Sequence, residues 1–464
     1  MTKQNSKLSI SSWIDANRCP FEEMALTLWA QPEIAHEEHI AARMQMDFMR
    51  ERGFRVTQKD GLPTAFVAEW GSGGPVIGLL GEYDALAGLS QTVSAQKEPV
   101  CSGAPGHGCG HNLLGAGCML AACALKQALE DCGHAATIRY YGCPAEEILT
   151  GKSDMAKLGY FDGLDVALTW HPSDSTYVSA ATMTALFSAK FRFKGITSHA
   201  GSAPANGRSA LDAVELMNIG ANYLREHMLD QDRLHYVITN GGLAPNIVPG
   251  DAEVWYFGRA PHAEELVSLW QRLNKVAQGA AMMTETEVSH ELLGGCYNTL
   301  PNQVLNRVFE ENLLNFAGEA AFDDKDFAFA RELQASLPPG QLDAALARSP
   351  LSGNDRVLAS KALPCRDAGN FMMASSDVGD VANMLPTATT WAATWPVSVP
   401  AHSWQAVASA GSGIGLKGTI VAAKAMATTA FDLAASPELV EAAKQEFAKA
   451  TNGRPYRPMS ELLK

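Results

Sequence analysis

The chain has 464 residues, and its 36 Lys and Arg against 50 Asp and Glu give a formal net charge of −14. This acidic balance argues against a nucleic-acid-binding protein, which needs a basic surface. Hydrophobic residues make up 47% of the chain and charged residues 19%, which excludes a disordered protein and, at roughly 100–200 residues per domain, predicts about two or three folded domains.

No segment of the sequence predicts a membrane span or a disulfide framework. The longest apolar run, Leu113 to Leu125, is broken by Gly115 and Gly117 and falls short of the roughly 18–20 residues that cross a bilayer. The first twelve residues are polar and lack the apolar middle of a secretory signal. The nine cysteines are scattered and odd in number, as in reduced proteins. We therefore expect a soluble, cytoplasmic protein in which a special cysteine is a ligand or a nucleophile.

The N-terminal part of the chain alternates helices with buried strands. Apolar patterns predict helices over 40–51 and 113–130, and strands over 65–70, 76–80, 136–142 and 164–170. This alternation predicts a largely parallel sheet with both faces covered. Ligands bind at the carboxyl ends of the strands in such sheets, so the polar residues that follow Leu80, Gly142 and Trp170 are the first candidates for chemistry.

A different pattern begins near Met183. Strands are predicted over 185–193, 235–239, 252–257 and 287–293, and helices over 209–229 and 263–283. The order β-α-β-β-α-β is that of a ferredoxin-like sandwich. We therefore predict an inserted α+β domain over residues 183–297.

The chain then returns to the first domain. A helix over 303–317 and a strand over 387–393 complete the first sheet, so the catalytic domain comprises residues 1–182 and 298–464. The charged, proline-containing stretch 322–363 is predicted to be a peripheral elaboration. The predicted fold class is α/β, with a central mixed, largely parallel sheet flanked by helices and the inserted ferredoxin-like domain.

Two clusters of side chains follow these predicted strands or open the long helix. Cys109 and His111 lie two residues apart between glycines, a spacing that can turn a thiolate and an imidazole toward one metal. A buried thiol beside a capping histidine would explain the same residues. Glu146 and Glu147 follow a strand, so one carboxylate can bind a metal while the other takes a proton from water. An exposed acidic turn is the alternative.

Two isolated histidines complete the set. His171 follows the strand over 164–170, and His402 lies in the sequence Ala-His-Ser-Trp. Each alone would more often be structural, but the clusters would converge on one edge of the sheet. The five candidate ligands are Cys109, His111, Glu147, His171 and His402. A catalytic zinc usually has about three protein ligands, so two metals are implied.

The order of these motifs resembles the di-metal aminoacylase, hippurate-hydrolase and auxin-conjugate-hydrolase family of metallopeptidases. The resemblance spans nearly the whole chain and rests on Gly81–Leu86, the Cys-x-His loop, the Glu-Glu pair, His171, Ser198–Ala200 and His402. It implies cleavage of the amide bond of an N-acyl or N-aroyl amino acid, such as p-aminobenzoyl-glutamate or indole-acetyl-aspartate. It also implies two divalent ions, Zn or Mn. By the same resemblance, the inserted domain over 183–297 is a lid or dimerisation domain through which a homodimer forms.

The resemblance assigns roles in the metal centre. Glu146 is the general base, and Cys109, His111, Glu147, His171 and His402 are the metal ligands. Asp84 orients a ligand histidine. Glu82 stands where many relatives place a ligand histidine, so it stays open as an extra ligand.

Three residues of the inserted domain also match the family. His199 resembles the histidine that reaches a neighbouring subunit's site and hydrogen-bonds the developing oxyanion, although a surface histidine is the alternative. Asn246 and Arg259 match substrate-contacting positions. The Arg259 guanidinium could pair with an α-carboxylate or form an ion pair within the domain.

Several other motifs favour structural interpretations. Ala35–His39 lacks the His-Glu-x-x-His spacing and is predicted to be an exposed helix start, and Gly411–Gly415 is predicted to be a helix-entry loop rather than a dinucleotide site. Trp391, Trp395 and Trp404 could line an aromatic-acyl pocket or belong to the core.

Two other functions stay open. Cys109 could be the nucleophile of a covalent amidase, but this leaves Glu147, His171 and His402 without a role. The chain could also be a conditionally active subunit of a two-component aminobenzoyl-glutamate hydrolase that needs a homologous partner. The presence of the Glu-Glu pair and all five ligand candidates argues against an inactive subunit.

Overall fold

A seven-stranded sheet organises the larger of two units in this computed structural model, which describes residues 2–347 and 350–464. Its strand order is β1 (Arg55–Thr57), β2 (Phe66–Gly71), β4 (Thr137–Cys143), β3 (Val76–Glu82), β5 (Val166–Ser173), β13 (Thr387–Ala393) and β6 (Tyr177–Ser179). The four strands from β4 to β13 run parallel, whereas β1, β2 and β6 pair antiparallel at the edges. The predicted mixed, largely parallel sheet is confirmed.

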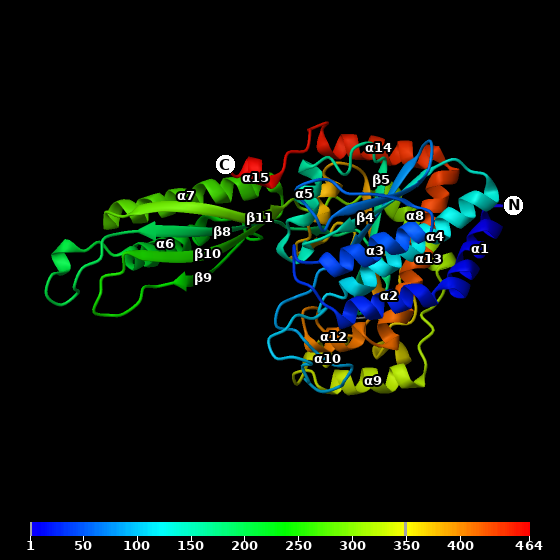
Figure 1. Ribbon diagram of the computed structural model, residues 1–464, viewed down its shortest axis with the longest axis horizontal. Coiled ribbons are helices and arrows are strands. Elements are labelled where there is room, and N and C mark those ends of the chain that lie inside the picture. The colour runs from blue at the N-terminus through cyan, green and yellow to red at the C-terminus, as the bar shows by residue number, and fades with distance from the viewer. Residues whose placement is uncertain (1, 348–349) are drawn as a thin grey trace. The chain divides into compact units, whose positions relative to one another are not determined.

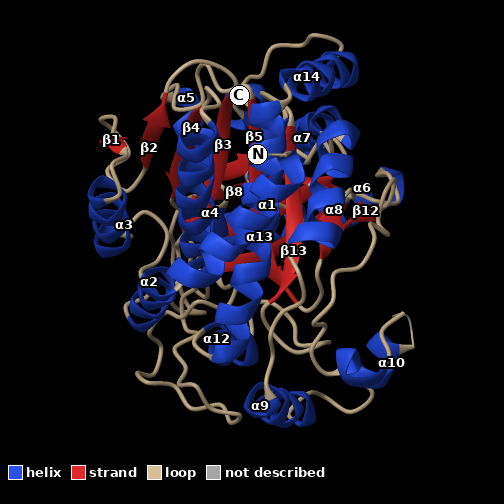
Figure 2. Cartoon of the chain, turned by 90° about the vertical axis from the view of Figure 1, so that its right-hand side faces the viewer, coloured by secondary structure: helices blue, strands red, loops and turns tan. Residues whose placement is uncertain are grey.

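Helices cover both faces of this sheet. On one face lie α1 (Lys3–Asn17), α4 (His111–Cys132), α8 (Gln303–Phe316) and α13 (Gly413–Ala435); Figure 2 shows α1, α4 and α13 in front of the strands. On the other face, α5 (Gly151–Lys157) packs with Tyr141, Phe161 and Leu385 in a second apolar cluster. Because both faces are covered, the strands are apolar runs and polar side chains collect beyond their ends.

Seven further helices lie outside these layers or extend them. They are α2 (Cys19–Ala30), α3 (His39–Glu51), α9 (Asp324–Ala335), α10 (Gln341–Leu346), α11 (Val378–Ala382), α12 (Trp404–Ala410) and α14 (Pro437–Thr451). Gly411–Gly415 joins α12 to α13, and the Ser412 hydroxyl accepts the Ile414 N–H at 3.2 Å, so this motif is the predicted helix-entry loop.

Helix α4 is long and apolar enough to cross a membrane by length and composition alone. Its most apolar window has a mean hydropathy of 1.3, but 89% of that window is buried inside the protein. The pair α12 and α13 passes the same test only if the 70° bend between them is ignored. Burial of this degree is typical of the central helix of a folded domain.

The second unit has an antiparallel sheet in the order β11 (Glu287–Cys296), β8 (Ala185–Lys194), β10 (Asp251–Ala260) and β9 (Arg233–Asn240). Helices α6 (Ala210–Leu224) and α7 (Ala263–Thr284) pack on it, and their order along the chain can be followed in Figure 1. Phe187 and Phe191 contact Trp270 between sheet and helix. The predicted ferredoxin-like order is confirmed.

The two units differ from the predicted domain limits in two short segments and by one or two residues at each end of the inserted domain. The first unit comprises the described residues of 1–181, 300–370 and 381–455, and the second comprises 182–299, 371–380 and 456–464. The predicted catalytic segment 298–464 therefore includes two stretches that pack elsewhere. The strand β12 (Phe371–Met372) pairs with β7 (Thr182–Met183), and α15 (Met459–Leu462) buries Met459 in the apolar core of the second unit.

Candidate metal centre

Polar side chains meet where three neighbouring parallel strands end. β3 ends at Glu82 and is followed by Asp84, while β4 leads into Glu146 and Glu147. His171 lies near the end of β5. Because β4, β3 and β5 are adjacent and parallel, their carboxyl ends share one edge, as the sequence predicts.

The Cys-x-His loop enters the same region at the start of α4. Gly110 has a φ of +73°, which an L side chain rarely adopts, and a Cβ there would lie 2.9 Å from the Pro172 ring. The following residue, His111, is the first of the helix and is fully buried. Glycine thus brings Cys109 and His111 against the strand end that carries His171.

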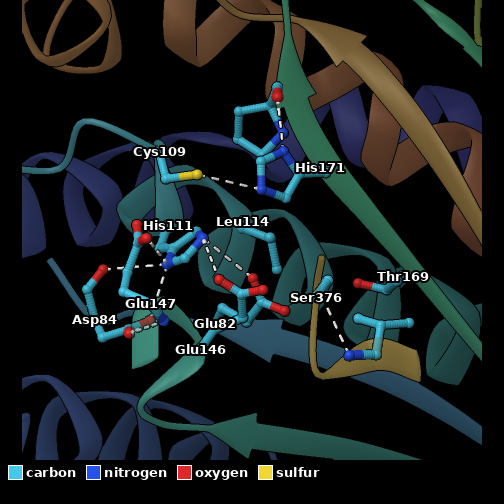
Figure 3. A network of polar contacts seen from close by, with 12 residues as sticks. Glu82, Asp84, Cys109, His111, Leu114, Glu146, Glu147, Thr169, His171 and Ser376 are labelled. Atoms are coloured by element: carbon cyan, nitrogen blue, oxygen red, sulfur yellow. Dashed lines mark hydrogen bonds and ion pairs between the residues drawn. The ribbon is translucent and has the colours of Figure 1, made fainter. Parts of the chain in front are cut away.

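Hydrogen bonds orient two imidazoles so that their Nε2 atoms face the centre. Asp84 accepts the Nδ1–H of His111 at 2.9 Å, and the Pro172 carbonyl accepts the Nδ1–H of His171 at 2.8 Å. The His171 Nε2 lies 3.4 Å from the Cys109 Sγ. A dashed line joins these two atoms in Figure 3. In a neutral imidazole that keeps its proton on Nδ1, the lone pair lies on Nε2, which is the form that binds a metal.

His402 approaches from a distant part of the sequence. It is held in the left-handed region at φ +59°, and its N–H donates to the Gly108 carbonyl at 2.8 Å. Its Nε2 lies 3.4 Å from Glu147 Oε2. The hydrogen bond to the Cys-x-His loop therefore places this imidazole, which is partly exposed, beside the buried carboxylate of Glu147.

The donor atoms form groups of the size that a divalent ion needs. Cys109 lies within 4.8 Å of His111 and His171, and also within 4.8 Å of Glu147 and His402. Two ligands about 2.1 Å from one tetrahedral ion lie roughly 3.4 Å apart, which is close to the separations given above. All five predicted ligands are thus brought together, and Cys109 belongs to both groups.

Buried atoms without hydrogen bonds support the same interpretation. Among the described residues, His111 Nε2, Glu147 Oε1 and Glu82 Oε2 are buried and have no hydrogen-bond partner. Burial raises the pKa of Glu147 to about 8, and neighbouring carboxylates add to this rise. Unpaired buried polar atoms are rare and costly, so these residues fit divalent cations.

The Cys109 thiol is not activated by its surroundings. Burial raises the pKa of this thiol far above its usual value, and the charge of Glu147 raises it further. A nucleophilic cysteine needs a lowered pKa, whereas a cation would itself stabilise the thiolate. The environment of Cys109 therefore favours a metal ligand over a nucleophile.

Glu82 takes part in a buried ion pair that the sequence does not reveal. Its Oε1 lies 2.6 Å from the Lys152 Nζ, and the Lys152 side chain is 0% exposed. Its Oε2 lies 3.2 Å from His111 Nε2. Burial alone would raise the pKa of Glu82, but the charges of Lys152 and His111 lower it. Glu82 is thus a charged carboxylate at the centre, grouped with His111 and Glu146.

Glu146 lies beside the ligands on a short turn that follows β4. Its side chain is buried, and its Oε2 lies 3.9 Å from His111 Nε2. The next residue, Glu147, donates its N–H to Asp84 Oδ2 at 2.8 Å. Asp84 therefore contacts both the turn and His111. Burial raises its pKa, but the bond to His111, the nearby charges and the Glu147 N–H together lower it.

Aromatic side chains border this centre. The Trp391 ring packs edge-on against His171, with centroids 5.0 Å apart, while Trp395 is buried in a small cluster with Ala406.

His107, two residues before Cys109, is also buried, but its Nε2 lies 3.2 Å from the Leu28 carbonyl. This histidine is therefore structural.

The three predicted residues of the inserted domain lie in the second unit. His199 is exposed, and its Nδ1 accepts the N–H groups of Gly201 and Ser202, both at 3.1 Å. Its Nε2 therefore carries the proton. Asn246 is exposed on the neighbouring segment, where its carbonyl accepts the Ala200 N–H at 3.0 Å.

Arg259 lies on β10 and is partly buried. Its Nη1 donates to Ser375 Oγ at 2.8 Å, and burial lowers its pKa. No carboxylate in the described ranges 2–347 and 350–464 forms an ion pair with it, so the predicted alternative of an intradomain ion pair does not hold there. Its guanidinium charge is thus not neutralised within the unit.

Known proteins are similar to this chain over nearly its whole length. Residues 184–282 match the peptidase dimerisation domain of the M20 peptidases. The chain is 41% identical over 461 residues to the B subunit of p-aminobenzoyl-glutamate hydrolase from Escherichia coli (strain K12), covering 96% of each chain. The chain belongs to the M20 peptidase family. It is therefore a hydrolase of a metallopeptidase family, and the family and enzyme class predicted from its motifs are confirmed.

Two further relatives define the breadth of the similarity. This M20 hydrolase is 30% identical over 440 residues to Xaa-Arg dipeptidase of Mus musculus, covering 91% of the chain and 88% of the relative. It also shares its fold with a dinuclear metal-binding peptidase of the M20 family from Bacillus subtilis, with a TM-score of 0.53, 15% identity, and coverage of 88% and 98% of the two chains.

Proposed function

We propose that this M20 hydrolase cleaves the amide bond of an N-acyl or N-aroyl amino acid, yielding a carboxylic acid and a free amino acid. The observation that carries the proposal is the cluster of thiol, imidazole and carboxylate donors with Glu146 beside it. The 41% identity to an aroyl-glutamate hydrolase subunit supports a substrate resembling p-aminobenzoyl-glutamate, with an indole-acetyl-aspartate-like conjugate as the second candidate.

Two divalent ions suit the donor groups. Cys109, His111 and His171 would hold one ion, and Cys109, Glu147 and His402 the other. When bound, such ions polarise a carbonyl and make a water molecule more acidic. The thiolate and imidazoles favour zinc, while the carboxylates also suit manganese.

The residues of the chain divide the remaining work. Glu146 accepts a proton from the attacking water and returns it to the leaving amine. The Nε2–H of His199 is free to donate to a developing oxyanion in a neighbouring subunit's site. Arg259, whose charge no carboxylate neutralises among the described residues, would pair with the α-carboxylate of the amino-acid product, and Asn246 would contact the substrate.

Removal of the metal ions is expected to abolish hydrolysis and to lower the thermal midpoint. When its free concentration is about 1,000 times its Kd, a cation that binds only the folded state stabilises that state by about 4 kcal/mol. Release of p-aminobenzoate from p-aminobenzoyl-glutamate is followed by liquid chromatography before chelation, after chelation, and after readdition of Zn²⁺ or Mn²⁺. Hydrolysis that survives in protein with no measurable metal would contradict the proposal and would favour the Cys109 nucleophile.

The proposed assembly is a homodimer through the second unit. The edge strand β9 pairs with β10 on one side, and its Tyr236, Val237 and Ile238 are 38%, 54% and 40% exposed. An apolar sheet edge of this kind readily pairs with another strand. A homologous subunit is the alternative partner, because the similar E. coli protein is named as one subunit of its enzyme.

The substitution Val237→Lys is expected to shift the dimer toward monomer, because a charged edge opposes strand pairing. Light scattering after size-exclusion chromatography measures the mass. Val100→Lys, at a valine that is 72% exposed in the first unit, is the matched control and should leave the mass unchanged. A monomeric wild-type chain that becomes active only with a homologous subunit would overturn the homodimer.

We also propose that the enzyme works in the cytoplasm. The nine cysteines, the candidate ligand Cys109 among them, form no disulfide in the described part of the chain, and a reducing compartment keeps thiols in this state. Fractionation of cells that express the tagged chain tests this placement.

A further inference from the structure

A buried carboxylate lies behind the turn that carries Glu146. Glu38 is 0% exposed, and its Oε1 accepts the Ala145 N–H at 2.8 Å. The prediction of an exposed helix start over 35–39 is therefore wrong at Glu38. Burial raises the pKa of this group to about 7, and the charge of Asp84 adds to the rise. A carboxyl group buried at such a cost indicates a specific task.

The turn itself needs external support. Ala145 and Leu149 have φ values of +54° and +59°, a region that residues other than glycine rarely adopt and that costs on the order of 1 kcal/mol each. Glu146 and Glu147 lie between these two strained positions. The backbone from which the Glu146 side chain extends is therefore held by contacts from outside the turn.

Two carboxylates from different segments supply such contacts on either side of Glu146. Ala145 donates its N–H to Glu38, and Glu147 donates its N–H to Asp84 at 2.8 Å. Asp84 is the charged acceptor of the two, since its pKa is lowered, and hydrogen bonds to charged acceptors are stronger than those between neutral groups. The segment before Glu38 also reaches the far end of the turn, where His36 Nε2 lies 2.9 Å from Thr150 Oγ1.

We propose that Glu38 is a positioning residue that fixes the backbone of the turn and so aims the Glu146 carboxylate. Asp84 holds the same turn and also His111, so its loss would disturb the metal ligands. Glu38 binds the turn through a backbone N–H, so its loss should disturb the base and leave the ions in place. This inference rests on the proposed role of Glu146 as general base.

The test compares Glu38→Met with Glu38→Gln in the metal-loaded full chain. The Met variant, which has no acceptor for the Ala145 N–H, is expected to lower kcat by about 10- to 100-fold, because small misplacements of catalytic groups have effects of this size. KM and metal content should stay as in the wild type. The Gln variant keeps an amide oxygen as acceptor and should recover most of kcat. Hydrogen exchange of the Ala145 amide should be faster in the Met variant alone.

Controls separate positioning from general stability. Glu33 caps α3 by accepting the N–H groups of Ile40 and Ala41, both at 2.9 Å, so Glu33→Ala should lower the thermal midpoint without lowering kcat. If the Met variant fails to fold, Glu38→Asp, which withdraws the acceptor by one methylene, should show the loss of kcat.

Three results would overturn the inference. The first is a wild-type kcat in Glu38→Met or, if that variant does not fold, in Glu38→Asp. The second is a loss of bound metal together with the loss of activity. The third is a Glu38→Gln variant that is no more active than Glu38→Met. If the wild-type chain hydrolyses no N-acyl amino acid, the proposed function fails, while the exchange rate at Ala145 still tests the hydrogen bond on its own.

Discussion

Replacing Glu146 with Gln is expected to lower kcat by on the order of 10⁴-fold, the upper end of what a general acid–base contributes. The amide keeps the size of the side chain but cannot accept the proton of the attacking water or return it to the leaving amine. The two cations should remain bound, because the two donor groups proposed to hold them consist of Cys109, Glu147 and the three histidines and do not include Glu146. Single-turnover kinetics and metal analysis by mass spectrometry measure the two quantities.

Glu147→Gln is the matched control for this experiment. The two glutamates are adjacent and both buried, but Glu147 Oε2 faces His402 Nε2 at 3.4 Å. Its replacement should therefore release metal and lose activity for that reason, with partial recovery in excess Zn²⁺ or Mn²⁺. A nearly full rate in Glu146→Gln, or equal metal loss in both variants, would show that the two roles are assigned wrongly.

The sequence predicts the site well where chemistry follows directly on a strong structural signal. The runs Val76–Leu80 and Leu164–Trp170 are apolar enough to be recognised as buried strands, so the polar residues beyond them fall at one sheet edge. The Cys-x-His loop lies between glycines and opens a long apolar helix. Local pattern and tertiary placement agree at these positions, and the candidate ligands could be named in advance.

Other residues of the site carry no local signal. Lys152 lies in the short helix Gly151–Lys157, whose composition is that of a surface helix, and charged residues are rarely buried. Its partner Glu82 is 70 positions away along the chain. Glu38 also lies in a polar stretch of sequence. It accepts a hydrogen bond from the backbone N–H of Ala145, and a backbone N–H leaves no pattern in the sequence. The burial of Lys152 and Glu38 depends on partners far away in the sequence and not on the local composition.

The elements that sequence patterns miss are short or weakly patterned. The strands β6, β7 and β12 have two or three residues, too few to show an alternation. Helix α1 is mostly polar but buries Ile10 and Ile14 against the apolar core. The short strands β7 and β12 and the last helix also explain why the second unit includes 371–380 and 456–464, which the predicted limits assign to the first domain.

Replacing Lys152 with Met is expected to destabilise the fold by about 3–5 kcal/mol, because removing one partner leaves a buried charge uncompensated. The Glu82 carboxylate would then face His111 Nε2 at 3.2 Å without the ammonium at 2.6 Å that lowers its pKa. Urea unfolding followed by circular dichroism measures the loss. Lys157→Met, on the same helix and in an exposed pair with Asp154, should cost about 0.5 kcal/mol or less.

The double variant Glu82→Gln/Lys152→Met separates charge balance from packing. If the ion pair is present only to balance charge, the neutral pair should recover most of the stability lost by Lys152→Met, since neutral replacements of buried pairs are often tolerated. If Glu82 also helps to hold a cation, the double variant should fold well but bind metal more weakly than the wild type, which isothermal titration with Zn²⁺ measures. Full metal affinity in a stable double variant would show that Glu82 does not help to hold a cation. Its contact with His111 Nε2 at 3.2 Å would then have a structural role alone.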